Sequence, residues 1–196
     1  ANRGWESRWW YNLLNGEDAH SKNAEVLGCT RDQAKTWLYA YIYGAGDAKL
    51  GRILGSKNGI KSREKFMSEF PALKKLNDRL KNKVKTQGYI TGLDGRIIKC
   101  DKEHVALNYL LQSAGSVIMK KALELVVVAF DVYKNDARFV ANVHDEWQLE
   151  VKDEDDTPDL VGMMCCQAIK EAGKELGFPC PMEGEYKIGR NWKETH

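Results

Sequence analysis

The first part of the chain is patterned for short helices separated by glycine-containing turns. Residues 5–14 (WESRWWYNLL) predict a short amphipathic helix that ends at Asn15-Gly16. Thr30 is a good N-cap residue and Gln33 completes a capping box, so a helix is expected over about 30–43. Three more helices are predicted at residues 47–54, 60–69 and 71–86, the last of which begins at a proline.

The rest of the chain mixes hairpins with long helices. β-favouring residues around Gly92-Leu93-Asp94-Gly95 predict a hairpin over about 88–100, and a long helix is expected over about 103–133. A second hairpin is predicted over about 138–151, with its strands joined at His144-Asp145-Glu146. A last helix begins at Thr157-Pro158 and precedes an irregular tail. Helices combined with a small antiparallel sheet indicate an α+β fold.

Composition narrows the class of protein. The chain has 196 residues, 43% of them hydrophobic and 30% charged, which suits one or two globular domains with a sizeable core. No run of 18 apolar residues and no opening signal segment occur, so neither a membrane partner nor secretion is expected. The five cysteines are odd in number and form no C-x-x-C, which favours reduced thiols in a cytoplasmic protein.

The two halves of the chain differ in charge although the whole carries only +2. Residues 1–100 hold 19 Lys and Arg against 10 Asp and Glu, a balance of +9. Residues 101–196 hold 11 against 18, a balance of −7. The basic half favours an anionic polymer as partner.

One face of the predicted helix over 30–43 combines cations with phenols. Arg31, Lys35, Tyr39 and Tyr43 are spaced four apart and therefore form one slightly spiralling stripe. Such a stripe suits a nucleoside triphosphate, with phosphates at the basic end and base and sugar against the rings. The alternative is a half-buried aromatic stripe with solvated cations. The chain has neither a Walker A motif nor a G-x-G-x-x-G fingerprint.

Two further patterns carry candidate chemistry. Asp145 and Glu146 lie at the predicted hairpin tip, where carboxylates can converge on Mg²⁺ (an exposed acidic turn is the alternative). Asn108 and Gln112 share one face of an otherwise apolar helix. Their amides suit the edges of bases in a nucleic-acid minor groove, or they could cap a neighbouring loop.

Together, these segments resemble family A DNA polymerases, most closely the replicative enzymes of T-odd-type podoviruses. Residues 31–47 (RDQAKTWLYAYIYGAGD) are similar to motif B, R-x-x-x-K-x-x-x-F/Y-x-x-x-Y-G, and VHDE at 143–146 is similar to motif C. Other matching segments follow in the family's order: LNGEDAHSKN at 14–23, GLDGR at 92–96, HVALNYLLQSAG at 104–115 and GRNWKETH at 189–196. The resemblance implies a right-hand polymerase fold, with fingers over 1–100 and the C-terminal part of the palm over 101–196.

The resemblance also implies roles for residues at the reaction centre. Asp145 would coordinate one of two Mg²⁺ ions, with Glu146 beside the metals and His144 near the primer end. Three side chains would bind the triphosphate of an incoming dNTP: His20, Arg31 and Lys35. Lys35 would also protonate the leaving pyrophosphate.

Further roles concern the sugar and the DNA. Tyr39 would pack against the incoming sugar, Tyr43 would stack near the templating position, and Gly44 would let the template pass. Contacts to the minor groove or backbone of primer-template DNA would come from Arg96, Asn108 and Gln112.

One element of the family pattern is missing. Motif A supplies a second metal-binding aspartate upstream of the segment at 14–23, and residues 1–13 contain no such motif. The chain alone is therefore expected to be inactive and to need a motif A aspartate from a second polypeptide of a split polymerase, or from a segment lost by cutting. That partner would also carry the thumb and the 3′–5′ exonuclease. Two alternatives are an enzyme like single-subunit RNA polymerases and a catalytically inactive DNA-binding or scaffold relative.

Overall fold

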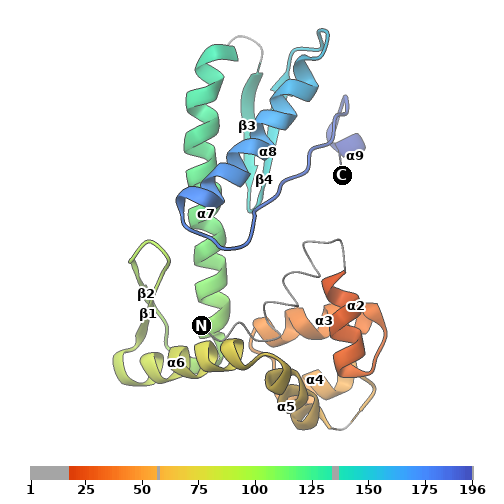
Figure 1. Ribbon diagram of the computed structural model, residues 1–196, viewed down its shortest axis with the longest axis vertical. Coiled ribbons are helices and arrows are strands. Elements are labelled where there is room, and N and C mark those ends of the chain that lie inside the picture. The colour runs from red at the N-terminus through yellow and green to blue at the C-terminus, as the bar shows by residue number, and fades with distance from the viewer. Residues whose placement is uncertain (1–17, 57, 134–136, 196) are drawn as a thin grey trace. The chain divides into compact units, whose positions relative to one another are not determined.

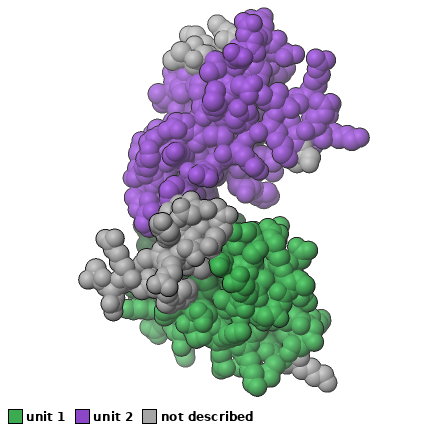
Figure 2. All heavy atoms as spheres, turned by 45° about the vertical axis from the view of Figure 1, so that its right-hand side comes forward, with its two compact units in different colours: residues 1–112 green, residues 113–196 purple. Residues whose placement is uncertain are grey.

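The chain has an α+β fold made of two compact units, residues 1–112 and 113–196 (Figure 2). A computed structural model describes residues 18–195 except residue 57 and residues 134–136. The described part is mostly helical and contains two separate two-stranded antiparallel sheets. No described helix combines the length and apolar character needed to cross a membrane.

The first unit is a run of helices followed by a hairpin (Figure 1). Its elements in chain order are α2 (Ala19–Leu27), α3 (Arg31–Ile42), α4 (Asp47–Ile53), α5 (Gly59–Glu69), α6 (Pro71–Gln87), β1 (Tyr89–Thr91), β2 (Ile97–Lys99), the 3₁₀ turn η1 (Glu103–Val105) and the start of α7 (Ala106–Tyr133). Strand β1 pairs with β2 in the register Ile90 opposite Ile98.

Aromatic packing fixes the orientation of α3 in this unit. Trp37 is fully buried and stacks on Tyr41 with ring centroids 5.5 Å apart, and Phe66 of α5 lies 5.0 Å from Trp37. Asn77 of α6 donates a hydrogen bond of 2.9 Å to the Tyr41 hydroxyl, so the buried phenol is satisfied. The inward face of α3 is therefore set by Ala34, Trp37 and Tyr41, at helical spacing.

The second unit contains the rest of α7 and a hairpin with a helix behind it. The hairpin consists of β3 (Ala137–Val143) and β4 (Glu146–Val151), and α8 (Thr157–Glu175) and the short α9 (Trp192–Thr195) follow. Residues of α7, the hairpin and α8 share one core: Val126 and Phe130 from α7, Phe139 and Trp147 from the hairpin, and Val161 and Cys165 from α8. The ring centroids of Phe130 and Phe139 lie 5.4 Å apart.

Most predicted elements are confirmed within a few residues, including the capping box of α3, in which Thr30 and Gln33 exchange hydrogen bonds. Helix α2 is an addition, since residues 15–29 carried no predicted helix. Glu146 belongs to β4, where it pairs with Val143, so the connection is shorter than predicted. The helix predicted at 5–14 lies outside the described residues.

The cysteines agree with the prediction of reduced thiols. All five are free in the structure. Burial raises the pKa of Cys165 to about 11, which keeps this thiol protonated near neutral pH.

Candidate active site

The predicted stripe on α3 lies on the solvent side of the helix. Arg31, Lys35, Tyr39 and Tyr43 are exposed, with 49% of Tyr39 and 57% of Tyr43 accessible. This follows from the core, because the buried positions 34, 37 and 41 occupy the opposite side of the helix. About half of each phenol is therefore available to a ligand, and the same exposure also fits the alternative of a half-buried aromatic stripe with solvated cations.

His20 reaches the stripe from α2. Its ring centroid lies 6.2 Å from that of Tyr39, with the planes tilted by 43°. His20 Nδ1 is buried and has no hydrogen-bond partner among the described residues. A ligand atom at this nitrogen would satisfy it. The packing of α2 against α3 therefore brings together two of the predicted nucleotide-binding residues from different helices.

Arg31 is held by Asp18, the N-cap residue of α2. Arg31 Nε donates to Asp18 Oδ2 at 2.8 Å, and Nη2 donates to Oδ1 at 3.0 Å. These hydrogen bonds, and then those from Ser21, hold the pKa of Asp18 well below its usual range. Asp18 was not singled out from the sequence, although Asp is one of the residues preferred at a helix N-cap.

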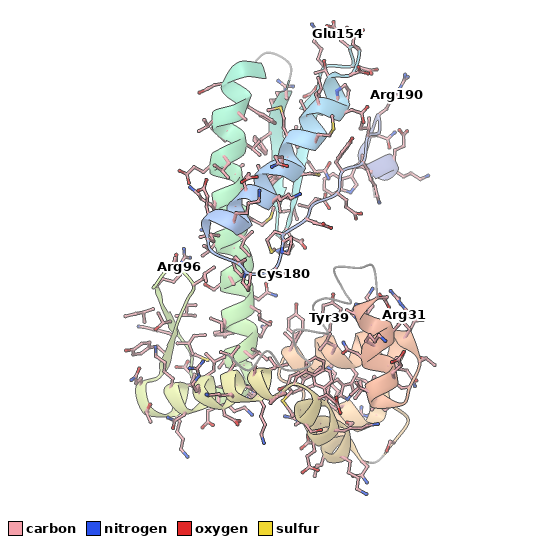
Figure 3. All side chains as sticks on the ribbon, viewed as in Figure 1. Arg31, Tyr39, Arg96, Glu154, Cys180 and Arg190 are labelled. Atoms are coloured by element: carbon pink, nitrogen blue, oxygen red, sulfur yellow. The ribbon has the colours of Figure 1, made fainter. Side chains whose placement is uncertain are left out.

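Lys35 differs from Arg31 because it makes no ion pair within the described part of the chain. The basic end of the stripe therefore has one cation with a carboxylate partner and one without. Figure 3 shows Arg31 and Tyr39 in the helical part of the first unit. An incoming anion would find Lys35 free and would share Arg31 with Asp18.

The end of the stripe contacts the start of α7. Gln112 Nε2 donates a long hydrogen bond of 3.4 Å to the Tyr43 hydroxyl. Gly44 has φ +80°, and a Cβ built there would lie 2.3 Å from the carbonyl oxygen of His104. A glycine is therefore required by the fold itself. Asn108 Oδ1, one turn before Gln112, is buried without a hydrogen-bond partner in the described structure.

Arg96 lies after the turn of the first hairpin and is paired within it. Its Nε is 2.9 and 2.7 Å from the two carboxylate oxygens of Asp94, and both residues are exposed. The hydrogen bonds from Arg96 lower the pKa of Asp94. Arg96, which is predicted to contact DNA, therefore resembles Arg31 in having a carboxylate on one edge of its guanidinium.

The predicted metal-binding residues lie where β3 turns into β4. His144 has φ +56°, an uncommon conformation for a residue other than glycine, and both His144 and Asp145 are exposed. Glu146 is partly buried and accepts a hydrogen bond from Gln148. In the described residues no group of three or more His, Cys, Asp or Glu could hold a metal ion. The donors suit Mg²⁺, which needs only one or two protein carboxylates, but they do not complete a two-metal site.

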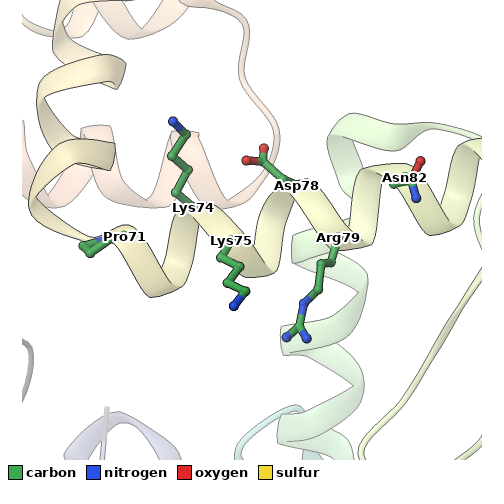
Figure 4. A pocket seen from close by; sticks show the side chains of 6 residues that line it. All are labelled: Pro71, Lys74, Lys75, Asp78, Arg79 and Asn82. Carbon is green, nitrogen blue, oxygen red and sulfur yellow. The ribbon is translucent and has the colours of Figure 1, made fainter. Parts of the chain in front are cut away.

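Helix α6, in the same unit as the stripe, has a basic face. The helix carries six Lys and Arg and one Asp. A shallow hollow on this face is lined by Pro71, Lys74, Lys75, Asp78, Arg79 and Asn82 (Figure 4). Neither Lys75 nor Arg79 makes an ion pair with any described residue, so much of this positive charge is uncompensated.

Comparison with known proteins identifies the family. The family model described as DNA polymerase family A matches residues 11–194. The DNA-directed DNA polymerase of Escherichia phage Phieco32 is 40% identical over 100% of this chain and 33% of its own length. That of Escherichia phage T7 is 34% identical over 95% of this chain and 29% of its own length. This chain thus spans about a third of these relatives.

A solved structure has a similar fold. It is the POL domain of Pol1 from M. smegmatis in complex with DNA primer-template and dNTP. The TM-score is 0.73 at 20% identity, over 86% of this chain and 33% of that one. Because the family model matches almost the whole sequence, the chain belongs to DNA polymerase family A.

Proposed function

We propose that this chain forms the fingers and the C-terminal part of the palm of an enzyme for template-directed 5′–3′ DNA synthesis. The observation that carries the proposal is the exposed α3 stripe with His20 beside Tyr39, in a member of family A. The fingers would correspond to residues 1–100 and the palm part to residues 101–196. Its phage relatives are encoded by viruses that infect bacteria, so its place of action would be the cytoplasm of the bacterial host.

The stripe and His20 would together bind the triphosphate and the sugar of the incoming dNTP. Lys35 and Arg31 would bind phosphate oxygens, and Lys35 would donate a proton to the leaving pyrophosphate. His20 would donate to a phosphate oxygen and Tyr39 would pack against the sugar. The distance of 6.2 Å between these two rings supports a shared ligand, because a nucleotide spans it.

Primer-template DNA would lie along the other end of the stripe. Tyr43 would stack near the templating base, and Gly44 would let the template pass beside it. Asn108 and Gln112 would form hydrogen bonds with the edges of bases in the minor groove, where the acceptors are similar for all base pairs. Arg96 would bind the DNA backbone through the guanidinium edge that Asp94 leaves open. The buried, unpartnered Asn108 Oδ1 supports a ligand at this face.

Asp145 and Glu146 would hold Mg²⁺ together with an aspartate from motif A, and His144 would lie near the primer end. Bound Mg²⁺ would neutralise charge that develops on the transferred phosphoryl group. The exposed Asp145 at a hairpin turn supports this role, because a ligand from outside this sequence can approach it. The chain alone would be inactive, and the missing aspartate would come from a second polypeptide or from another part of a longer protein.

The test is reconstitution of primer extension. The chain is mixed with a polypeptide that carries motif A and the thumb, and extension is measured with Mg²⁺. We expect activity only in the mixture, and a loss of at least about a thousandfold (about 4 kcal/mol) with Asp145→Asn. Asp153→Asn, the same change at another exposed position of the second unit, is the matched control.

The same assay separates the alternatives. An active mixture that is unaffected by Asp145→Asn would show that the metal assignment is wrong. Incorporation of NTPs in preference to dNTPs would favour an RNA polymerase. DNA binding without extension in any mixture would favour the inactive scaffold.

A further inference from the structure

A single carboxylate joins the starts of two helices at the basic end of the stripe. Asp18 Oδ2 accepts from the backbone N–H of Ser21 at 2.8 Å, which caps α2. The same carboxylate accepts two hydrogen bonds from Arg31, the first residue of α3. The cap that starts the helix of His20 therefore also fixes the side chain of Arg31.

The hydrogen bonds occupy only one edge of the guanidinium. Arginine has five N–H donors in a planar fork, and Asp18 takes the Nε hydrogen and one Nη2 hydrogen. Three N–H donors remain: one on Nη2 and one on Nη1 form the other edge, and the second on Nη1 points back toward the Cδ side. That edge has the spacing to bind two oxygens of a phosphate. A carboxylate oxygen of Asp32 lies 4.0 Å from Nη1, on a side chain that is 94% exposed.

We infer that Asp18 is a positioning residue for the triphosphate: it holds the Nε edge of Arg31 so that the Nη edge is preorganised for a phosphate group. This rests on the proposed function in one respect, namely that the ligand of the stripe is a nucleoside triphosphate. A flexible arginine would lose side-chain entropy on binding the anion, and Asp18 reduces that loss before the ligand arrives.

The direction in which anion affinity changes when Asp18 loses its charge separates positioning from simple electrostatics. Simple electrostatics says that removing a negative charge beside an anion site tightens anion binding. Positioning predicts the opposite for Asp18. Asp18→Asn keeps a side-chain oxygen that can cap α2, because Asn is as good an N-cap as Asp, but it removes the charged two-point interaction with Arg31. Asp32→Asn is the matched control, since it removes the same charge next to Arg31 and leaves the hydrogen bonds of Arg31 to Asp18 in place.

The experiment measures binding of inorganic tripolyphosphate and of dATP to the whole chain by calorimetry. We expect Asp18→Asn to weaken binding of both by about three- to tenfold, in line with the removal of one charge-assisted pair. Asp32→Asn should leave the affinity unchanged or raise it slightly. Unfolding curves of each variant report whether α2 is still capped. Binding by Asp18→Asn as tight as that of the wild type, or tighter, would overturn the inference.

The same Asp18→Asn change, made in a chain that already carries Arg31→Lys, separates positioning of Arg31 from an effect through the cap of α2. Lysine cannot form the two-point interaction, so in an Arg31→Lys chain Asp18→Asn should leave the affinity for tripolyphosphate unchanged or raise it slightly, as Asp32→Asn does in the wild type. An equal loss of affinity in both backgrounds would mean that Asp18 acts only through the cap, which overturns the inference. If Arg31→Ala binds tripolyphosphate as well as the wild type does, the phosphate-binding role of Arg31 in the proposed function is wrong.

Discussion

At the scale of the residue, Gly44 is the position where backbone conformation and the candidate site meet. It has φ +80°, and a Cβ there would lie 2.3 Å from the backbone oxygen of His104. We expect Gly44→Ala to lower the free energy of unfolding by about 3 kcal/mol, from backbone strain of about 1–2 kcal/mol and displacement of η1. Gly28→Ala is the control, since Gly28 has φ +69° but open space around it. Urea unfolding of the two variants measures the difference, and equal losses would show that η1 moves away at no cost.

Asp18 gives the stability of the chain a predictable response to acid. Its pKa is lowered in the folded state, chiefly by Arg31, so its contribution is present at neutral pH and is lost as pH falls below about 4. The difference in urea midpoint between wild type and Asp18→Asn should therefore be largest near neutral pH and shrink in acid. The shrinkage should be smaller in an Arg31→Gln background. A difference that does not change with pH would assign the effect to the cap geometry alone.

At the scale of the element, the capping box of α3 sets where the stripe begins. Thr30 Oγ1 accepts from the backbone N–H of Gln33, and Gln33 Oε1 accepts from the N–H of Thr30. Thr30→Ala should cost about 1 kcal/mol of unfolding free energy and weaken tripolyphosphate binding, since Arg31 is the next residue. Thr36→Ala, at an exposed threonine inside the same helix, should be neutral or slightly stabilising. Equal effects of the two changes would contradict a role for the cap.

The helices that could be predicted from the sequence are those whose caps and apolar faces agree. Helix α3 is such a case, because Thr30 marks its start and Trp37 and Tyr41 mark its buried face. Helix α2 is not, because its buried residues are Asn23 and Ala24, and a face with a buried amide has no apolar periodicity. Only its local signals, Asp18 before it and Gly28 after it, indicated a helix.

The candidate site also has a part that could be predicted from the sequence and a part that could not. The stripe could be predicted because its spacing depends on one helix only. The contacts of His20 with Tyr39 and of Asp18 with Arg31 could not, since they depend on how α2 packs against α3. The position of Asp145 and Glu146 where β3 turns into β4 followed from the local strand pattern, whereas the motif A aspartate lies outside this sequence in the proposed function.

At the scale of the whole molecule, the separation of charge is concentrated on particular helices. Residues 1–100 carry +9, and α6 alone contributes six cations against one carboxylate. Residues 101–196 carry −7. A net charge of +2 therefore describes neither half, and binding to a polyanion should depend on which cationic side chains are removed rather than on how many.

This dependence is testable with two variants of equal charge. Lys75→Gln/Arg79→Gln changes the exposed face of α6, and Lys170→Gln/Lys174→Gln changes exposed lysines of α8. If α6 binds phosphates of primer-template DNA, the first variant should bind DNA more weakly, and the slope of log affinity against log salt should fall by about 0.9 for each phosphate that is no longer neutralised. The second should match the wild type. Fluorescence anisotropy with labelled DNA over a range of salt concentrations measures both slopes. Equal weakening in the two variants would mean that net charge alone governs binding and that α6 has no special role.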